Sequence, residues 1–231
     1  MTGLSLAEIA DKMKISKTTP EASADFTTFV MNRVYSSFLN AGMERTPGVH
    51  VSSIIYDCMR SPCYGIKHGR RMDLMGIIRT GIGTHLHDDI KILPVQELPL
   101  EWEGIVTDGV DEYDPETGIF IDKKITWNPP SYGMWDKHKK QLEDYKVMLH
   151  DNGYKATEGF ILYIVLSKPN SLMQLRHGNK IRALKTVRKE MRANRDIILR
   201  FNETGELPPR VCGQDCNFCA DAAECLTGYL K

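Results

Sequence analysis

The chain of 231 residues lacks several features that would each assign it to a distinct class of protein. It contains no run that approaches the roughly 18 consecutive apolar residues of a membrane helix. Its first residues, Met-Thr-Gly-Leu-Ser-Leu, do not show the basic and then apolar layout of a secretion signal. Internal repeats and low-complexity segments are also absent. We therefore expect a globular protein of a reducing, cytoplasmic compartment that does not associate with a membrane.

The chain also lacks an excess of charge of one sign, with 30 Lys and Arg against 30 Asp and Glu. Proteins that bind nucleic acid usually carry a basic surplus, so this balance alone disfavours such a partner. The charges are segregated, however. Segment 88–122 has 11 acidic residues and a single lysine, and segment 180–200 has 8 basic residues against 2 acidic ones. A charge run usually marks a solvated face, but this pattern also suits a metal site beside a surface for a polyanion.

The order of predicted elements indicates an α/β domain at 51–231 that follows a helical extension at 1–50. Apolar residues repeat at helical spacing through the extension, and Thr46-Pro47-Gly48 ends the pattern. The centre of the domain has the period of strands, with a turn of five turn-forming residues that favours an antiparallel hairpin. We expect helices at 51–57, 73–90, 135–149 and 180–200, and strands at 104–111, 119–126 and 159–166.

The cysteines are clustered, since four of the six lie within fourteen residues near the C-terminal end. In a reducing compartment clustered thiols bind metal more often than they form disulfides. Paired CxxC motifs would favour zinc. A single CxxC, another cysteine six residues on and further thiols far upstream favour an iron–sulfur cluster. A zinc site in a structural nucleic-acid binder and ordinary buried cysteines are the alternatives. The six are Cys58, Cys63, Cys212, Cys216, Cys219 and Cys225.

Two carboxylates and a lysine fall on the predicted hairpin in a pattern suited to hydrolysis. Asp108 lies towards the end of the first strand, and Asp122 and Lys124 are two residues apart on the second, so these two point to one face. Carboxylates bind a hard divalent cation, the cation activates water, and a lysine orients that water or offsets negative charge. Alone, this pattern arises easily by chance in a chain with 26% charged residues.

Residues on either side of the hairpin strengthen the pattern. His85 and His87 lie upstream, where a histidine would supply a further metal ligand, although a lone histidine is more often a surface or satisfied core residue. Downstream, Gln141 and Tyr145 lie one helical turn apart on one face. Such a pair can also be no more than a hydrogen bond on a helix surface.

Taken in order, these motifs resemble the RecB-like branch of the PD-(D/E)xK nuclease superfamily. The match is best with the iron–sulfur exonucleases of the CRISPR-associated type and their viral relatives, which share the cluster with the AddB nucleases. The resemblance covers residues 52–228. In the first motif, Gly83-Thr84-x-x-His87, the resemblance implies His87 as the histidine ligand of the metal. The second motif, Gly104-x-x-x-Asp108-Gly109-Val110, supplies Asp108 as a metal ligand, and the third, Ile119-Phe-Ile-Asp122-Lys123-Lys124, supplies Asp122 as a ligand and Lys124 as the catalytic lysine. Gln141-x-x-x-Tyr145 corresponds to the QxxxY motif.

The same resemblance implies the ligands of a [4Fe–4S] cluster. Cys216, Cys219 and Cys225 match the C-terminal triplet of the family, and the fourth ligand comes from an upstream C-x-R segment. Cys58, in Cys58-Met-Arg60, fits that segment better than Cys63 does. Cys212 is a third candidate, because it would complete a purely local cluster. One departure concerns Asp122, which stands where these relatives commonly have Glu and so has a shorter reach to a metal.

The resemblance implies a restriction-endonuclease-like core, with a mixed central sheet flanked by helices and a C-terminus stapled by the cluster. It implies a metal-dependent DNA exonuclease that acts on single-stranded ends, with Mg²⁺ or Mn²⁺ held by His87, Asp108, Asp122 and the Lys123 carbonyl; the histidine favours Mn²⁺. A second copy of the chain or other DNA-processing proteins are further expected partners. The alternative is a catalytically weak or inactive DNA-binding or adaptor module of the same fold. The residues expected to grip DNA are Arg60, Lys139, Lys140, Arg188 and Arg192.

Overall fold

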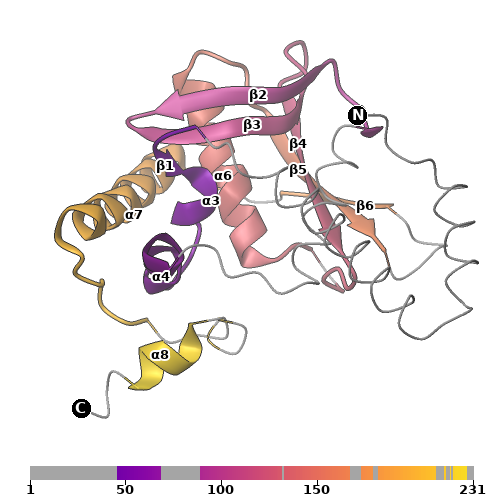
Figure 1. Ribbon diagram of the computed structural model, residues 1–231. Coiled ribbons are helices and arrows are strands. Elements are labelled where there is room, and N and C mark those ends of the chain that lie inside the picture. Colours follow the sequence, from indigo (N-terminus) through magenta and orange to yellow (C-terminus); the bar gives the residue numbers. More distant parts are fainter. Residues whose placement is uncertain are drawn as a thin grey trace, which may run out of the picture.

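The computed structural model shows an α/β architecture in which a mixed six-stranded sheet is flanked by helices (Figure 1). The helical extension expected at 1–50 lies outside the described residues, apart from its last five. Most of the helix expected at 73–90 lies outside them too. None of the described helices combines the length and apolarity that a membrane span requires. The structure describes residues 46–68, 89–131, 133–166, 173–178, 182–211, 216, 219 and 221–227.

The sheet is built around β3, which pairs with three other strands. Its neighbours are β1, parallel to it, and β2 and β4, both antiparallel; β4 then pairs with β5 in parallel, and β5 with β6 in antiparallel. The expected hairpin is confirmed as β3 and β4, and the expected buried strand as β5. The strands are β1 (Val49–His50), β2 (Val95–Trp102), β3 (Ile105–Tyr113), β4 (Ile119–Thr126), β5 (Glu158–Val165) and β6 (Met173–His177).

Strands β3 and β4 pair over a short stretch only and then separate. The pairs are Glu112 with Ile121 and Tyr113 with Phe120. The first two residues of β3, Ile105 and Val106, pair with β1 instead. The middle of β3 therefore has no strand beside it on this edge within the described residues. Backbone groups there need other partners, and this opening is where the candidate site lies.

The helices cover one face of the sheet and close the main core. The long helix α6 lies against the sheet, and α7 packs on α6 (Figure 1). Buried apolar side chains of both helices, among them Leu142, Met148, Val187 and Met191, meet those of the strands in one cluster. Helix α7 ends at Gly205, whose φ of 69° places it in the left-handed region that glycine favours. The helices are α3 (Val51–Ile54), α4 (Arg60–His68), α6 (Asp136–Asp151), α7 (Leu184–Thr204) and α8 (Ala222–Thr227).

On the opposite face of the sheet an ion pair is completely buried. Lys123 Nζ donates to Glu112 Oε1 at 3.0 Å and to the carbonyl of Ile90 at 2.9 Å, and both charged side chains have 0% exposure. The other carboxylate oxygen of Glu112 accepts from the backbone N–H groups of Ile92 and Leu93, at 3.0 and 2.7 Å. A buried pair is tolerated only when its remaining hydrogen-bonding groups are satisfied in this way. The pair fixes segment 90–93 to the back of the sheet.

Candidate active site

Asp122 and Lys124 project together from β4, as their spacing predicts. The ammonium of Lys124 lies 2.9 and 2.8 Å from the two carboxylate oxygens of Asp122. Phe120, two residues before Asp122, pairs with Tyr113 of β3, so the face that carries the site continues onto that strand. The carboxylate of Asp122 is buried, whereas a quarter of the Lys124 side chain is exposed. The lysine is thus the member of the pair that reaches the surface.

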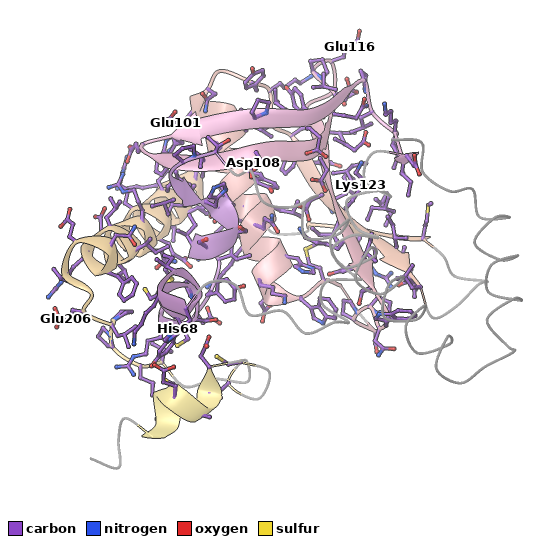
Figure 2. All side chains as sticks on the ribbon, viewed as in Figure 1. His68, Glu101, Asp108, Glu116, Lys123 and Glu206 are labelled. Carbon is purple, nitrogen blue, oxygen red and sulfur yellow. The ribbon has the colours of Figure 1, made fainter. Side chains whose placement is uncertain are left out.

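The second carboxylate of the site is Asp111 and not Asp108. Asp111 is buried, and its Oδ2 accepts from the backbone N–H of Lys123 at 2.5 Å. This bond bridges β3 and β4 where their backbones have separated, so the side chain takes the place of a ladder partner. Asp108, on β3 in Figure 2, is exposed; it accepts from the N–H of Thr46 and lies 3.6 Å from His50. The structure therefore brings Asp111, rather than Asp108, together with Asp122 and Lys124.

A β-bulge on β3 separates Asp108 from Asp111. Leu98 pairs with Val110 and Leu100 with Thr107, so two residues of β3, Asp108 and Gly109, lie opposite Pro99 alone. Proline cannot donate to a ladder and is tolerated at such an irregularity. The alternation on the site face therefore has to be counted back from the Tyr113–Phe120 pair, and this count gives Asp111. The signal that could have found it is the hairpin turn, which sets the register.

The pKa values of Asp111 and Lys124 depend on burial and on the neighbouring charges of the site. Burial raises the pKa of Asp111 to about 6, against the opposing effects of Lys124 and of the hydrogen bond from Lys123. Burial disfavours the charged form of Lys124, but the carboxylates of Asp122 and Asp111 raise its pKa above the ordinary value. Two buried carboxylates with one lysine leave room for further positive charge. The oxygen donors present therefore fit a hard divalent cation.

Gln141 and Tyr145 form the expected pair on α6, and it is buried. Gln141 Nε2 donates to the Tyr145 hydroxyl at 2.8 Å, and this hydroxyl also shares a hydrogen bond with Thr107 of β3. Burial, and then the charges of Asp122 and Asp111, raise the pKa of Tyr145 well above its usual value. Tyr145 is therefore a neutral hydrogen-bonding group that ties α6 to β3 beside the two carboxylates.

His138 is a site residue that the sequence analysis missed. Its Nδ1 lies 2.9 Å from the hydroxyl of Tyr163 on β5, and the side chain is buried. Burial and the charge of Lys124 lower the pKa of His138 to about 3, so the imidazole is neutral at physiological pH. The only sequence signal was its position one helical turn before Gln141–Leu142, at the start of the same helix. A neutral imidazole offers one donor and one acceptor here.

The site opens into a cleft of about 670 Å³. One wall is the beginning of α6, with Lys137, His138 and Gln141, and Lys124 reaches the cleft beside them. The facing wall comes from segment 48–56 and α4, and it adds the hydroxyls of serine residues. The end of α7 and Asp221 complete the lining. Lys124 is thus the member of the carboxylate–lysine group that lines the cleft, and Asp221 of the C-terminal segment lines it as well.

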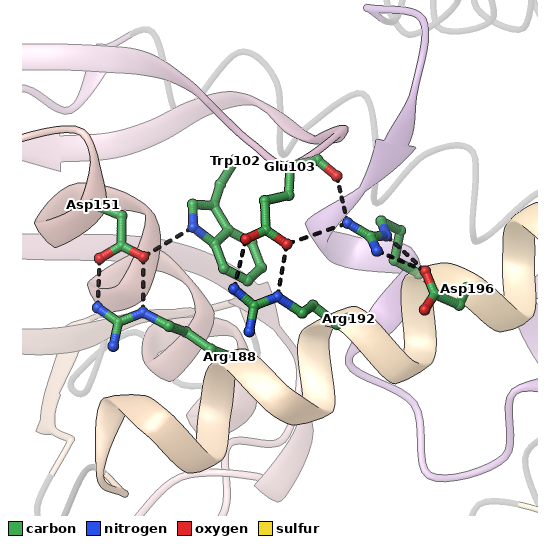
Figure 3. A network of polar contacts seen from close by, with 7 residues as sticks. Trp102, Glu103, Asp151, Arg188, Arg192 and Asp196 are labelled. Carbon is green, nitrogen blue, oxygen red and sulfur yellow. Dashed lines mark hydrogen bonds and ion pairs between the residues drawn. The ribbon is translucent and has the colours of Figure 1, made fainter.

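The arginines of α7 that were expected to grip DNA are engaged within the chain (Figure 3). Arg188 donates to both oxygens of Asp151 at the end of α6, at 2.8 and 2.5 Å. Arg192 donates to both oxygens of Glu103, at 2.7 and 2.6 Å, with its guanidinium over the ring of Trp102. The β2–β3 turn and the end of α6 therefore neutralise this face of the helix.

Of the other three cations expected at the DNA, two also have partners in the fold. Arg60 Nε donates to the carbonyl of Pro208 at 2.7 Å, and its Nη1 lies 3.7 Å from Cys225 Sγ. Lys140 pairs with Asp57 at 2.5 Å and with Glu190 at 3.2 Å. Lys139 is half-buried on α6. The other lysine that lines the cleft with Lys124 is Lys137, which was not among the residues expected at the DNA.

The described cysteines come from two parts of the chain that meet at α4. Cys63 of α4 is fully buried, and burial together with nearby Cys58 raises its pKa to about 11. Cys58, Cys216, Cys219 and Cys225 are each partly exposed. Within the described residues no three His, Cys, Asp or Glu side chains surround one point. His87 and Cys212 lie outside those residues. Thiolate donors of this kind fit an iron–sulfur cluster by their chemistry.

Ion pairs hold α8 to α4 independently of any metal. Glu224 lies 3.4 Å from Lys67 and 3.1 Å from His68. Together with the contact of Arg60 with Cys225, these pairs place the last cysteine beside the segment that carries Cys58. Both of these cysteine-bearing segments therefore belong to one small region of the molecule.

Comparisons with known proteins bear on the fold. No family model matches the chain, and no curated protein matches it. Nine solved chains match, among them "Crystal structure of SSO0001", with a TM-score of 0.53 and 14% sequence identity. The match covers 86% of this chain and 95% of that one. At this identity the likeness concerns the fold alone: an α/β fold of nearly the same extent occurs in a solved protein.

Proposed function

We propose that the protein is a Mg²⁺- or Mn²⁺-dependent deoxyribonuclease, an exonuclease of the RecB-like PD-(D/E)xK type that acts on single-stranded ends. One observation carries the proposal. Asp111, Asp122 and Lys124 gather where β3 and β4 separate, and Lys124 opens into the cleft. Two carboxylates beside a lysine are the groups that phosphodiester hydrolysis with a metal-bound water requires.

The residues divide the work of the reaction. Asp111 and Asp122, with the Lys123 carbonyl and His87, would hold the cation, which when bound acidifies a water and stabilises charge on the phosphate. Lys124, positioned by its ion pair with Asp122, orients the attacking water and offsets charge that develops on the phosphate. Gln141 donates to Tyr145, and Tyr145 bonds Thr107, so this pair holds α6 in position on β3 beside the carboxylates.

The size of the cleft supports a single strand as substrate. About 670 Å³ lies within the roughly 300–1,000 Å³ of typical small-ligand pockets. Such a space suits a short stretch of single strand. Lys137, which lines the cleft, replaces Arg188 and Arg192 as the cation proposed to meet the backbone.

We further propose that Cys58, Cys216, Cys219 and Cys225 hold a [4Fe–4S] cluster with a structural role. The thiols come from opposite ends of the domain, and ion pairs between α4 and α8 bring the two cysteine-bearing segments together. Cys63 is less suited, because its thiol is fully buried and its pKa is raised, and a cluster needs thiolates.

The decisive experiment compares two aspartates. Labelled single-stranded DNA is incubated with Mn²⁺ and wild type, Asp111→Asn, Asp108→Asn or Lys124→Ala. We expect Asp111→Asn and Lys124→Ala to lower the rate by at least about a hundredfold, and Asp108→Asn to stay within a few-fold of wild type. Loss of activity in Asp108→Asn with an active Asp111→Asn would contradict the assignment. A wild type that binds DNA without cutting it would favour the inactive DNA-binding module.

A further inference from the structure

Trp135 is a large exposed aromatic residue in contact with His138 and Lys137, two residues that line the cleft. It directly precedes α6, and 37% of it is exposed. Many exposed aromatic residues are mobile surface groups. Trp135 is different, because its backbone and its ring are both fixed.

Three contacts hold Trp135 in place. Its backbone N–H donates to the hydroxyl of Tyr163 at 3.3 Å. Its ring meets those of Tyr163 and His138 edge to face, with centroids 5.7 and 5.1 Å apart. The same Tyr163 hydroxyl lies 2.9 Å from His138 Nδ1, so the three residues form one unit anchored on β5. An aromatic group fixed in advance loses little entropy when it binds a ligand.

The position of this unit relates it to the site. His138 lines the cleft together with Lys124 and Gln141. Lys137, also in the lining, is exposed and holds its ammonium 5.7 Å from the centre of the Trp135 ring. An exposed lysine can leave the ring for a phosphate oxygen. The arrangement therefore combines a flat apolar surface with a mobile cation, next to the proposed catalytic group.

We infer that Trp135 and Lys137 form a stacking subsite for one nucleobase of the single strand, next to the nucleotide being cut. The inference rests on the proposed function. Trp135 would stack on the base and Lys137 would pair with a neighbouring phosphate. Base–aromatic stacking is sequence-tolerant because every base has a π-face. A subsite of this kind selects unstacked, single-stranded DNA without reading its sequence, since bases in a duplex already stack on one another.

The test uses an oligothymidylate with a fluorescent label and a single abasic site at each of the first six positions from the end. Binding is measured in the Lys124→Ala background, where the strand survives, and cutting is measured in the wild-type background. We expect Trp135→Ala to weaken binding of the intact strand about 5- to 100-fold. We expect one abasic position to weaken binding by a similar factor, and only when Trp135 is present.

Two controls separate stacking from folding. Trp135→Phe keeps a ring and should recover most of the binding. Tyr154→Ala removes a comparably exposed aromatic residue near the other end of α6, one that also meets a neighbouring ring edge to face, and should change nothing. If the wild type cuts DNA but Trp135→Ala responds to abasic sites as the wild type does, the subsite is wrong and the proposed function stands. If the wild type neither binds nor cuts DNA, both proposals fall.

Discussion

Gly109 is the residue on which the geometry of the bulge depends. A Cβ at this position would lie 2.5 Å from Glu97 Oε2 and 2.7 Å from Glu97 Cα. Glu97 itself has a φ of 50°, so the backbone of β2 is irregular at this contact. A side chain at 109 would push the two strands apart, two residues before Asp111.

We therefore expect Gly109→Ala to lower the free energy of unfolding by about 1–3 kcal/mol, as overpacking does. Urea denaturation measures the change. Gly65→Ala is the matched control, since nothing lies within 4 Å of a Cβ at that helical position. The control should raise stability by about 0.5–1 kcal/mol. Equal stability of Gly109→Ala and wild type would contradict this prediction and show that β2 can move to make room for the side chain.

For single residues, the sequence predicted which side chains close in sequence share a face. It did not predict contacts between residues of different elements. Asp122 with Lys124 follows from the two-residue period of a strand, and Gln141 with Tyr145 from the helical turn. Asp111 shares the site face because it lies two residues before Tyr113, which pairs with Phe120 of β4. How far that face extends along β3 depends on the bulge opposite Pro99 of another strand. The neutral state of His138 likewise depends on burial and on Lys124, a residue of another element.

Helix α7 shows at the scale of elements why a basic stripe is a poor guide to a DNA surface. Its arginines meet carboxylates at the end of α6 and in the β2–β3 turn, where Glu103 and Gly104 both have positive φ. These carboxylates are far from the arginines in sequence, so no local sequence pattern could predict the ion pairs. Strand β2 was missed for a related reason, because Gln, Glu and Pro are weak strand formers and its pairing with β3 overrides that tendency.

The Arg188–Asp151 pair makes the packing of α7 on α6 depend on pH. Hydrogen bonds from Arg188 lower the pKa of Asp151 below its usual range, against its burial. Since the folded-state pKa is below the unfolded value of about 3.9, the pair stabilises the fold above about pH 4. This stabilisation is lost as the pH falls towards the folded-state pKa.

We expect Asp151→Asn to lower the free energy of unfolding by about 1–3 kcal/mol at neutral pH. The difference from wild type should shrink steadily as the pH falls below about 4. Denaturant titrations across this range provide the measurement. Glu206→Gln removes the partner of Arg200 in a pair whose side chains are 70% and 65% exposed, and it should have little effect at any pH. A pH-independent difference for Asp151→Asn would mean that the charge is not what matters.

At the scale of the whole molecule, the C-terminal segment closes a long loop. Arg60 and Cys225 are 165 residues apart in sequence and in contact in the fold. Cross-links that close long loops restrict the unfolded chain most. A cluster held by Cys58 and the C-terminal cysteines would therefore add stability to the domain as a whole.

Anaerobic purification of wild type, Cys225→Ser and Cys63→Ser tests this role. We expect a brown wild type with about four irons, and a Cys225→Ser variant that loses iron and unfolds at a lower temperature. Cys63→Ser should keep its iron, although a hydroxyl in a fully buried position will lower stability. A colourless protein with zinc would overturn the cluster, and iron loss in Cys63→Ser alone would move the fourth ligand to Cys63.

Strand β4 carries two adjacent lysines, Lys123 and Lys124, and the register of the strand determines which of them reaches the site. A slip of one residue would turn Lys124 to the apolar back of the sheet and bring Lys123 to the cleft, since every side chain changes face. It would also leave Glu112, which has no exposure, without its ammonium. An uncompensated buried charge costs about 3–5 kcal/mol. The buried pair thus fixes the register of β4 from the back of the sheet, and this register places Lys124, and not Lys123, at the cleft.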